Sequence, residues 1–167
     1  MLAGTLLRQC EDNIKFATTV ARKRQAVRDQ AMIYLMIYAG LRGGEIAALN
    51  WEDIRIHERS GTVAIVGERV VPLNTELRRV VSCWRDIIGV SAGSCAVFIG
   101  KQGRITTRTV QRRVEDIGRQ VGIDVSPRDL RVIFARRLLD RTVPLDRVQK
   151  LLGHARVEST ARYVSAG

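Results

Sequence analysis

The chain has 167 residues, enough for one compact domain with a single buried core but too few for a multidomain machine. Hydrophobic residues make up 46% of the chain and charged residues 27%, which excludes a disordered tail. Lysine and arginine total 28 against 17 acidic residues, a formal net charge of +11. A polyanionic partner, a biased genome composition and a general solubility charge would each account for it.

The first part of the chain is predicted to be helical. Residues 5–24 mix apolar and charged positions, as on a surface helix that ends in a basic stretch. A central helix follows from Val27; it is apolar on nearly every face and is therefore expected to be buried, and Gly40 is placed to end it. A short helix is predicted over 45–49.

A small antiparallel sheet is predicted next, with strands over 61–66 and 69–73 and the dipeptide Gly67-Glu68 as the hairpin turn. The later elements are a helix over 75–88 capped by Asn74, a short strand over 96–99, a helix from Thr106 or Thr107 to 121, a helix from Ser126-Pro127 to 140, a helix from Pro144 to 152 and a last helical turn over 159–164. The fold class is therefore α+β, mostly α.

Several enzyme classes are excluded because their motifs are missing. The chain has no GxxxxGK[ST], GxGxxG, HExxH or GxSxG motif. His57 and His154 are the only histidines, and the three cysteines lack zinc-ligand spacing, so we expect no metal and no cofactor. Odd, unpaired cysteines favour a reduced cytoplasm, and the longest apolar run, 31–40, is too short to cross a membrane.

Arg128 and Arg131 are candidate phosphate ligands at a predicted helix start. They are three residues apart and so share a helical face, in the first turn, where free N–H groups and the helix dipole favour anions. Forked guanidinium donors also match phosphate oxygens. The alternative is that they form surface salt bridges with Asp129 or Asp124.

Arg42 follows the buried helix in the sequence Gly-Leu-Arg-Gly-Gly-Glu, so the core is expected to hold its backbone rigid. Glu45, three residues later, is placed to orient the Arg42 guanidinium or to cap the next helix. An arginine in a glycine-containing turn is, by itself, more often structural than catalytic.

Tyrosine is the candidate nucleophile, because phosphate chemistry without metal ligands needs an oxygen nucleophile and fixed positive charge. Tyr34 and Tyr38 belong to the buried helix and are most simply core residues. Tyr163 instead lies in a polar segment beside Arg162, where a cluster of arginines would lower the phenol pKa from its ordinary value of about 10.

Five short motifs occur in a fixed order along the chain. They are Gly-Leu-Arg-x-x-Glu at 40–45, Val-Val-Pro-Leu at 70–73, Asp-Leu-Arg at 129–131, Leu-Leu-Gly-His at 151–154 and Thr-x-x-Tyr at 160–163. Each motif is weak alone, but the five in this order and spacing resemble the catalytic domain of tyrosine recombinases, the phage integrase family. The resemblance covers nearly the whole chain from about residue 5.

The resemblance implies roles for particular residues. Arg42 and Arg131 resemble the two arginines that clamp the scissile phosphate, His154 the histidine that contacts a nonbridging oxygen, and Tyr163 the nucleophile. The implied reaction is metal-independent: the phenol oxygen attacks a DNA phosphate, forms a 3′-phosphotyrosyl bond and releases a 5′-hydroxyl. This is the chemistry of site-specific recombination or integration, as in an integrase or transposase of a mobile element.

The resemblance also implies partners and an organisation. Double-stranded DNA is the expected partner, with a homotetramer on DNA and a monomer or weak oligomer when free. Residues 1–167 are interpreted as the tyrosine-recombinase-like catalytic domain, with the family's N-terminal core-binding domain absent. The candidates for contact with the DNA backbone are Arg104, Arg108, Arg112 and Arg113.

Two positions depart from the family pattern. Arg128 stands where the family usually has a histidine that assists proton transfer, and an arginine is no ordinary general base. The family also places a lysine in the hairpin turn, whereas this turn has none; Arg69 could substitute in part, although its high pKa makes it a poor acid.

Two other functions share much of this pattern. A non-catalytic DNA-binding remnant or regulator would keep the arginine surface without the chemistry. A type IB topoisomerase-like enzyme would share the phosphotyrosine step but relax supercoils, and the Leu-Leu-Gly-His motif disfavours it.

Overall fold

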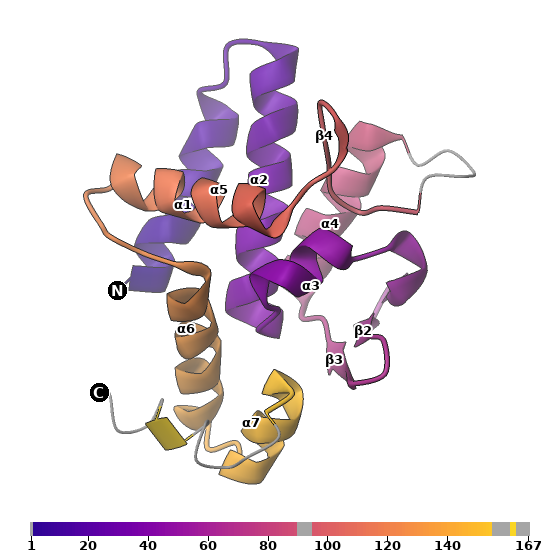
Figure 1. Cartoon of the computed structure of the whole chain (residues 1–167), viewed down its shortest axis with the longest axis vertical. Coiled ribbons are helices and arrows are strands. Elements are labelled where there is room, and N and C mark those ends of the chain that lie inside the picture. Colours follow the sequence, from indigo (N-terminus) through magenta and orange to yellow (C-terminus); the bar gives the residue numbers. More distant parts are fainter. Residues whose placement is uncertain (1, 90–94, 155–160, 163–167) are drawn as a thin grey trace.

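The structure is a computed structural model that describes residues 2–89, 95–154 and 161–162. Helices dominate, and a small sheet lies to one side of them (Figure 1). The helices are α1 (Leu2–Lys15), α2 (Val20–Ala39), α3 (Gly43–Ala48), α4 (Thr75–Ile88), α5 (Thr107–Gln120), α6 (Pro127–Leu139) and α7 (Leu145–Leu152), with a 3-10 turn η1 (Trp51–Asp53). The strands are β1 (Ile54–Ile56), β2 (Gly61–Ile65), β3 (Arg69–Pro72), β4 (Ile99–Gly100) and β5 (Gly103–Arg104).

Helix α2 is the centre of the core, as its apolar sequence predicts. Its residues from Val27 to Ala39 are buried almost without exception, and α1, α4 and α6 pack around it. Burial of each large aliphatic side chain contributes roughly 1.5–3 kcal/mol to folding. The helix ends at Gly40, whose φ of 66° is the left-handed conformation that glycine adopts without strain.

The boundary between the first two helices differs from the prediction. Helix α1 ends at Lys15 and α2 already begins at Val20, so the predicted single helix over 5–24 is wrong. The reason is the N-cap: the Thr19 hydroxyl accepts a hydrogen bond from the Arg22 N–H at 3.2 Å. The basic stretch that was expected to end one helix therefore lies in the exposed first turns of the next.

The three-stranded sheet is antiparallel in the order β1-β2-β3, with Val63 opposite both Ile54 and Val71. The predicted hairpin is present, and its loop has three residues, 66–68, with Gly67 at a φ of 73°. Strand β1 was not predicted, because three residues after a turn give too short an alternation to recognise.

The predicted strand over 96–99 is wrong for most of its length. Val97 and Phe98 are buried core residues, but only Ile99 and Gly100 belong to a strand, which pairs with β5. Ala96 forms only an isolated antiparallel bridge with Asn50, in which the Val97 N–H donates to the Leu49 carbonyl oxygen at 2.9 Å. The apolar character of this segment therefore reflects burial beside a single bridge and not a regular strand.

The later helices begin where their capping residues predict. Asn74 accepts from the Leu77 N–H at 2.8 Å, Thr106 caps α5, and Ser126 forms a capping box with Asp129. Of the turn predicted over 159–164, only residues 161 and 162 are described, and both are helical. Within the described ranges, no helix is both long enough and apolar enough to cross a membrane.

This arrangement brings distant segments together at one place. The start of α3 follows the end of α2, β3 packs against α7, and α6 packs against both α2 and α7 (Figure 1). The candidate site lies where these elements meet.

Candidate active site

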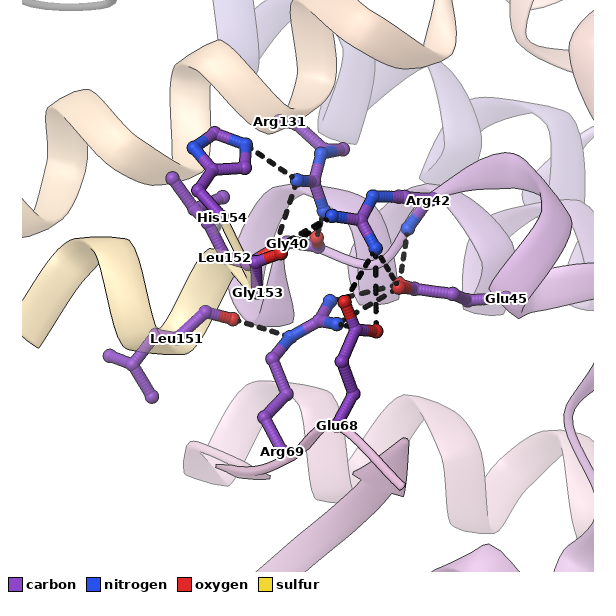
Figure 2. A network of polar contacts seen from close by, with 10 residues as sticks. All are labelled: Gly40, Arg42, Glu45, Glu68, Arg69, Arg131, Leu151, Leu152, Gly153 and His154. Atoms are coloured by element: carbon purple, nitrogen blue, oxygen red, sulfur yellow. Dashed lines mark hydrogen bonds and ion pairs between the residues drawn. The ribbon is translucent and has the colours of Figure 1, made fainter. Parts of the chain in front are cut away.

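Three arginines from distant parts of the chain converge on the carboxyl-terminal end of α7: Arg42 before α3, Arg69 in β3 and Arg131 in α6 (Figure 2). Arg69 Nε donates to the Leu151 carbonyl oxygen at 2.7 Å and Arg131 Nη2 to that of Leu152 at 3.1 Å. Arg42 Nη2 donates to the carbonyl oxygens of Gly153 at 2.9 Å and of Leu152 at 3.4 Å. The last carbonyls of a helix lack intrahelical partners and carry its negative dipole end, so they hold guanidinium groups well.

Glu45 orients Arg42 and caps α3, and so fills both roles suggested by its spacing. The Arg42 backbone N–H donates to Glu45 Oε2 at 2.7 Å, and Arg42 Nη1 donates to Glu45 Oε1 at 2.9 Å. Burial alone would raise the pKa of Glu45, but hydrogen bonds from Arg69 and Arg42, together with their charges, lower it below its ordinary value. Glu45 is therefore a carboxylate at neutral pH.

Arg69 lies behind this pair, with a side chain only 5% exposed. Its two terminal nitrogens donate to the two oxygens of Glu45, each at 2.9 Å, and Nη1 also donates to Glu68 at 2.9 Å. The structure therefore brings Arg69 to the site but uses its donors to fix Glu45 and α7.

Arg131 is buried and contacts His154. Its Nη1 donates to the Gly40 carbonyl oxygen, and its Nη2 lies 3.1 Å from His154 Nε2. A guanidinium can only donate, so Nε2 accepts and a neutral imidazole carries its proton on Nδ1. Burial, followed by the charges of Arg131, Arg42 and Arg69, lowers the pKa of His154 below its ordinary value and favours that neutral form.

A cavity of about 380 Å³ opens beside these residues. Among the described residues, its lining contains four arginines, one histidine and no carboxylate. The lining residues are Arg42, Gly43, Pro127, Arg128, Arg131, His154 and Arg162. A cavity with this lining suits a phosphate or another oxyanion.

Arg128 does not form the salt bridges that were the alternative for this helix start. The Asp129 side chain accepts from the N–H and hydroxyl of Ser126 at 2.8 and 2.6 Å, so it serves the helix cap. Arg128 is exposed and makes no ion pair with any described residue. Its guanidinium is therefore available to a ligand in the cavity.

The predicted nucleophile, Tyr163, lies outside the described residues. Arg162, which precedes it, lines the cavity. The other two tyrosines are structural, as expected: Tyr34 is buried and donates to Glu11 at 3.2 Å, and Tyr38 lies under the Arg137 guanidinium at 4.5 Å. Burial and the Glu11 charge raise the pKa of Tyr34 above its ordinary value, which opposes formation of a phenolate.

The four arginines proposed to contact DNA divide into two pairs. Arg113 ion-pairs with Asp29 at 2.7 Å, and Arg104 donates to the backbone carbonyls of α3 and the loop after it. These two are engaged within the protein. Arg108 and Arg112 are exposed on α5.

Glu68 is the residue of this site that the sequence did not reveal. Its carboxylate accepts from Arg42 at 3.0 Å, although the two residues are 26 apart in the chain. No local pattern connects a hairpin turn to a helix start, so only the folded arrangement shows the contact.

In the part of the chain that the structure describes, no three His, Cys, Asp or Glu side chains are placed to hold a metal ion.

Comparison with known proteins gives a consistent result. The model of the Phage integrase family matches residues 8–166. The tyrosine recombinase XerC of Vibrio atlanticus (strain LGP32) is 35% identical over 147 residues, covering 83% of this chain and 47% of the relative. XerC of Stutzerimonas stutzeri (strain A1501) is 38% identical, covering 83% and 48%. The chain thus spans about half the length of the curated relatives it matches.

Solved structures share the fold. The crystal structure of XerA recombinase matches with a TM-score of 0.80 at 25% identity, covering 96% of this chain and 55% of XerA. XerH site-specific recombinase bound to difH substrate, in a pre-cleavage complex, matches with a TM-score of 0.80 at 21% identity, covering 97% and 48%. The predicted family and the predicted mostly helical fold are confirmed, and the chain belongs to the phage integrase family.

Proposed function

We propose that this chain is the catalytic part of a site-specific tyrosine recombinase, which cuts and rejoins DNA through a 3′-phosphotyrosyl intermediate. The observation that carries the proposal is the cavity in which Arg42, Arg128, Arg131 and Arg162 face one space without a carboxylate among its described lining residues. A phosphodiester has one negative charge, and the pentacovalent species formed by attack has more. Fixed cations therefore stabilise the transition state more than the ground state.

Arg42 and Arg131 would clamp the nonbridging oxygens of the scissile phosphate. Both guanidiniums are held by backbone carbonyls before any ligand arrives, and Arg131 is only 5% exposed. Such preorganised donors need little rearrangement during the reaction. His154, neutral and with its proton on Nδ1, would add one further donor.

Tyr163 would supply the nucleophilic phenol oxygen. It follows Arg162 directly in sequence, and Arg162 lines the cavity. Attack forms the bond from the phenol oxygen to phosphorus and breaks the bond to the 5′ oxygen. Since Arg128 cannot act as an ordinary base and Arg69 is engaged with Glu45, we assign both proton transfers, from the phenol and to the 5′ oxygen, to water.

Double-stranded DNA is the proposed substrate and partner. XerH, which shares the fold, was solved bound to its difH substrate. The beginning of α5 lies beside the cavity, since a Cβ on Gly43 would be 3.7 Å from Thr107. Arg108 and Arg112 on that helix would contact flanking phosphates, in a tetramer assembled on DNA in the cytoplasm.

The test is capture of the covalent intermediate. The protein first selects its preferred duplex from a randomised pool, and a nicked suicide version of that duplex is then incubated with the protein and resolved on a denaturing gel. A covalent adduct that disappears in Tyr163→Phe is expected. An adduct that survives this substitution would rule out Tyr163 as nucleophile, and bound DNA without an adduct would indicate a regulator that only binds. Relaxation of plasmids lacking the selected sequence would indicate a topoisomerase.

A further inference from the structure

Glu68 places a carboxylate from the β2–β3 turn against two arginines of the site (Figure 2). Its oxygens lie 3.0 and 3.3 Å from Arg42 Nη1, and Oε2 lies 2.9 Å from Arg69 Nη1. Glu68 is 37% exposed, whereas Glu45 on the same arginines is 12% exposed. The two carboxylates therefore differ in how readily a ligand could replace them.

All the terminal N–H groups of Arg42 are occupied by acceptors. Nη1 donates to Glu45 and Glu68, and Nη2 donates to the carbonyl oxygens at the end of α7. A phosphate that takes a forked contact on Arg42 must displace one of them. The carbonyls belong to a helix end, and Glu45 is held by both terminal nitrogens of Arg69 and by the Arg42 backbone N–H. Glu68 has a single Arg69 nitrogen as a second partner and is more exposed, so it is the acceptor that is easiest to displace.

The charges match this exchange. Arg42 and Arg69 carry two positive charges, and Glu45 and Glu68 carry two negative charges, so the four residues sum to zero. A phosphodiester carries a single negative charge. Exchanging Glu68 for a phosphodiester therefore leaves the sum unchanged.

The end of α7 leaves room for the Glu68 carboxylate. A Cβ on Gly153 would lie 2.7 Å from both Glu68 Oε1 and Arg69 Nη1, so a larger residue would disturb this ion pair. The turn that carries Glu68 lies at the surface, and Val66 at its tip is 83% exposed. Outward movement of the turn would therefore break little packing.

We propose that Glu68 is an internal anionic ligand of Arg42, which the scissile phosphate displaces when DNA enters the site. This inference rests on the proposed function. Competition by Glu68 weakens the binding of isolated phosphates and of DNA that makes few other contacts. A substrate that also contacts the rest of the surface has the additional binding energy to displace the carboxylate.

The test compares Glu68→Gln with Glu58→Gln, which removes the same charge from an exposed residue of the β1–β2 loop. Inorganic phosphate is titrated while the side-chain 15N resonance of Arg42 is followed, a measurement that does not depend on DNA cleavage. Glu68→Gln should bind phosphate at Arg42 at least about threefold more tightly than Glu58→Gln does. If the two variants bind phosphate with equal affinity, Glu68 acts only through its general negative charge. If Glu68→Gln binds phosphate more weakly, Glu68 is a positioning residue for Arg42. Either result overturns the proposal.

A second measurement needs no substitution. In the unaltered protein, saturating phosphate should shift the 13C resonance of the Glu68 carboxyl group and leave that of Glu45 in place. If the Glu68 resonance does not move while Arg42 reports bound phosphate, the carboxylate is not displaced and the proposal fails. If phosphate displaces Glu68 but no covalent adduct forms on DNA, the proposed cleavage chemistry fails while the proposed exchange of Glu68 for phosphate stands.

Discussion

Arg131 Nη2 and His154 Nε2 are 3.1 Å apart, so a buried cation fixes both the protonation state and the tautomer of the histidine. The pKa of His154 is lowered by burial first and then by Arg131, Arg42 and Arg69. An imidazole fixed in this way offers Nδ1–H as a donor and does not add a positive charge to the arginine cluster. The protonation of the His154 ring therefore depends on the charges of the surrounding arginines.

The first prediction concerns stability against pH. His154 has a lower pKa in the folded than in the unfolded chain, so the folded state binds its proton less readily. The resulting contribution to stability is complete above the unfolded value of about 6.5 and is lost as the pH falls through the lower folded value. We expect the free energy of unfolding, measured with urea between pH 8 and 5, to fall more in the unaltered protein than in His154→Gln.

The control for this experiment is present in the chain. His57 is exposed and present in both proteins, so the difference between the two curves isolates His154. Parallel curves for the unaltered protein and His154→Gln would show that the Arg131 contact does not alter the histidine's protonation in solution.

The second prediction concerns Arg42. Removing one preorganised charged donor should cost about 3 kcal/mol of transition-state stabilisation, on the order of a 100-fold lower rate. Arg42→Ala should therefore slow single-turnover cleavage of the nicked substrate by about that factor. Arg79→Ala is the control, because Arg79 is 62% exposed on α4 and pairs only with Glu76 among the described residues. A loss below tenfold for Arg42→Ala would mean that Arg42 serves the structure and not the chemistry.

The third prediction concerns Arg128. If this exposed arginine supplies only charge, then Arg128→His should restore a group that can exchange protons near neutral pH and should raise the cleavage rate. Arg128→Gln separates the two effects, because it removes the charge without adding a base. A rate for Arg128→His no higher than that of the unaltered protein would contradict this account of the departure from the family pattern.

Local signals predicted the parts of the fold and site that neighbouring residues decide. The caps at Asn74 and Ser126 and the contact of Arg42 with Glu45 all join residues three apart. The boundary between α1 and α2 was misplaced because the amphipathic pattern runs on past the break, and only the cap at Thr19 marks it. The pattern therefore identifies helices better than it identifies their ends.

Long-range contacts were outside the reach of the sequence. Arg113 meets Asp29 across 84 positions of the chain, and Arg131 meets the Gly40 carbonyl across 91. The acceptors at the end of α7 are backbone atoms, which any residue type would provide. Sequence motifs could therefore single out Arg42 and Arg131, which line one cavity, but not the atoms that hold them in place.

The last prediction concerns Gly40, which joins the core to the site. Its φ of 66° is strained for other residues, and a Cβ there would clash with the Phe134 ring. Gly40→Ala should therefore lower the free energy of unfolding by about 2 kcal/mol or more, measured by urea denaturation. Gly4→Ala in α1 is the matched substitution, because no neighbour lies within 4 Å of the new Cβ, and there alanine should stabilise the helix by roughly 0.5–1 kcal/mol. If the two substitutions change the free energy of unfolding equally, the end of α2 tolerates a side chain. In that case the turn at Gly40 is not what holds the Gly40 carbonyl oxygen in place for Arg131.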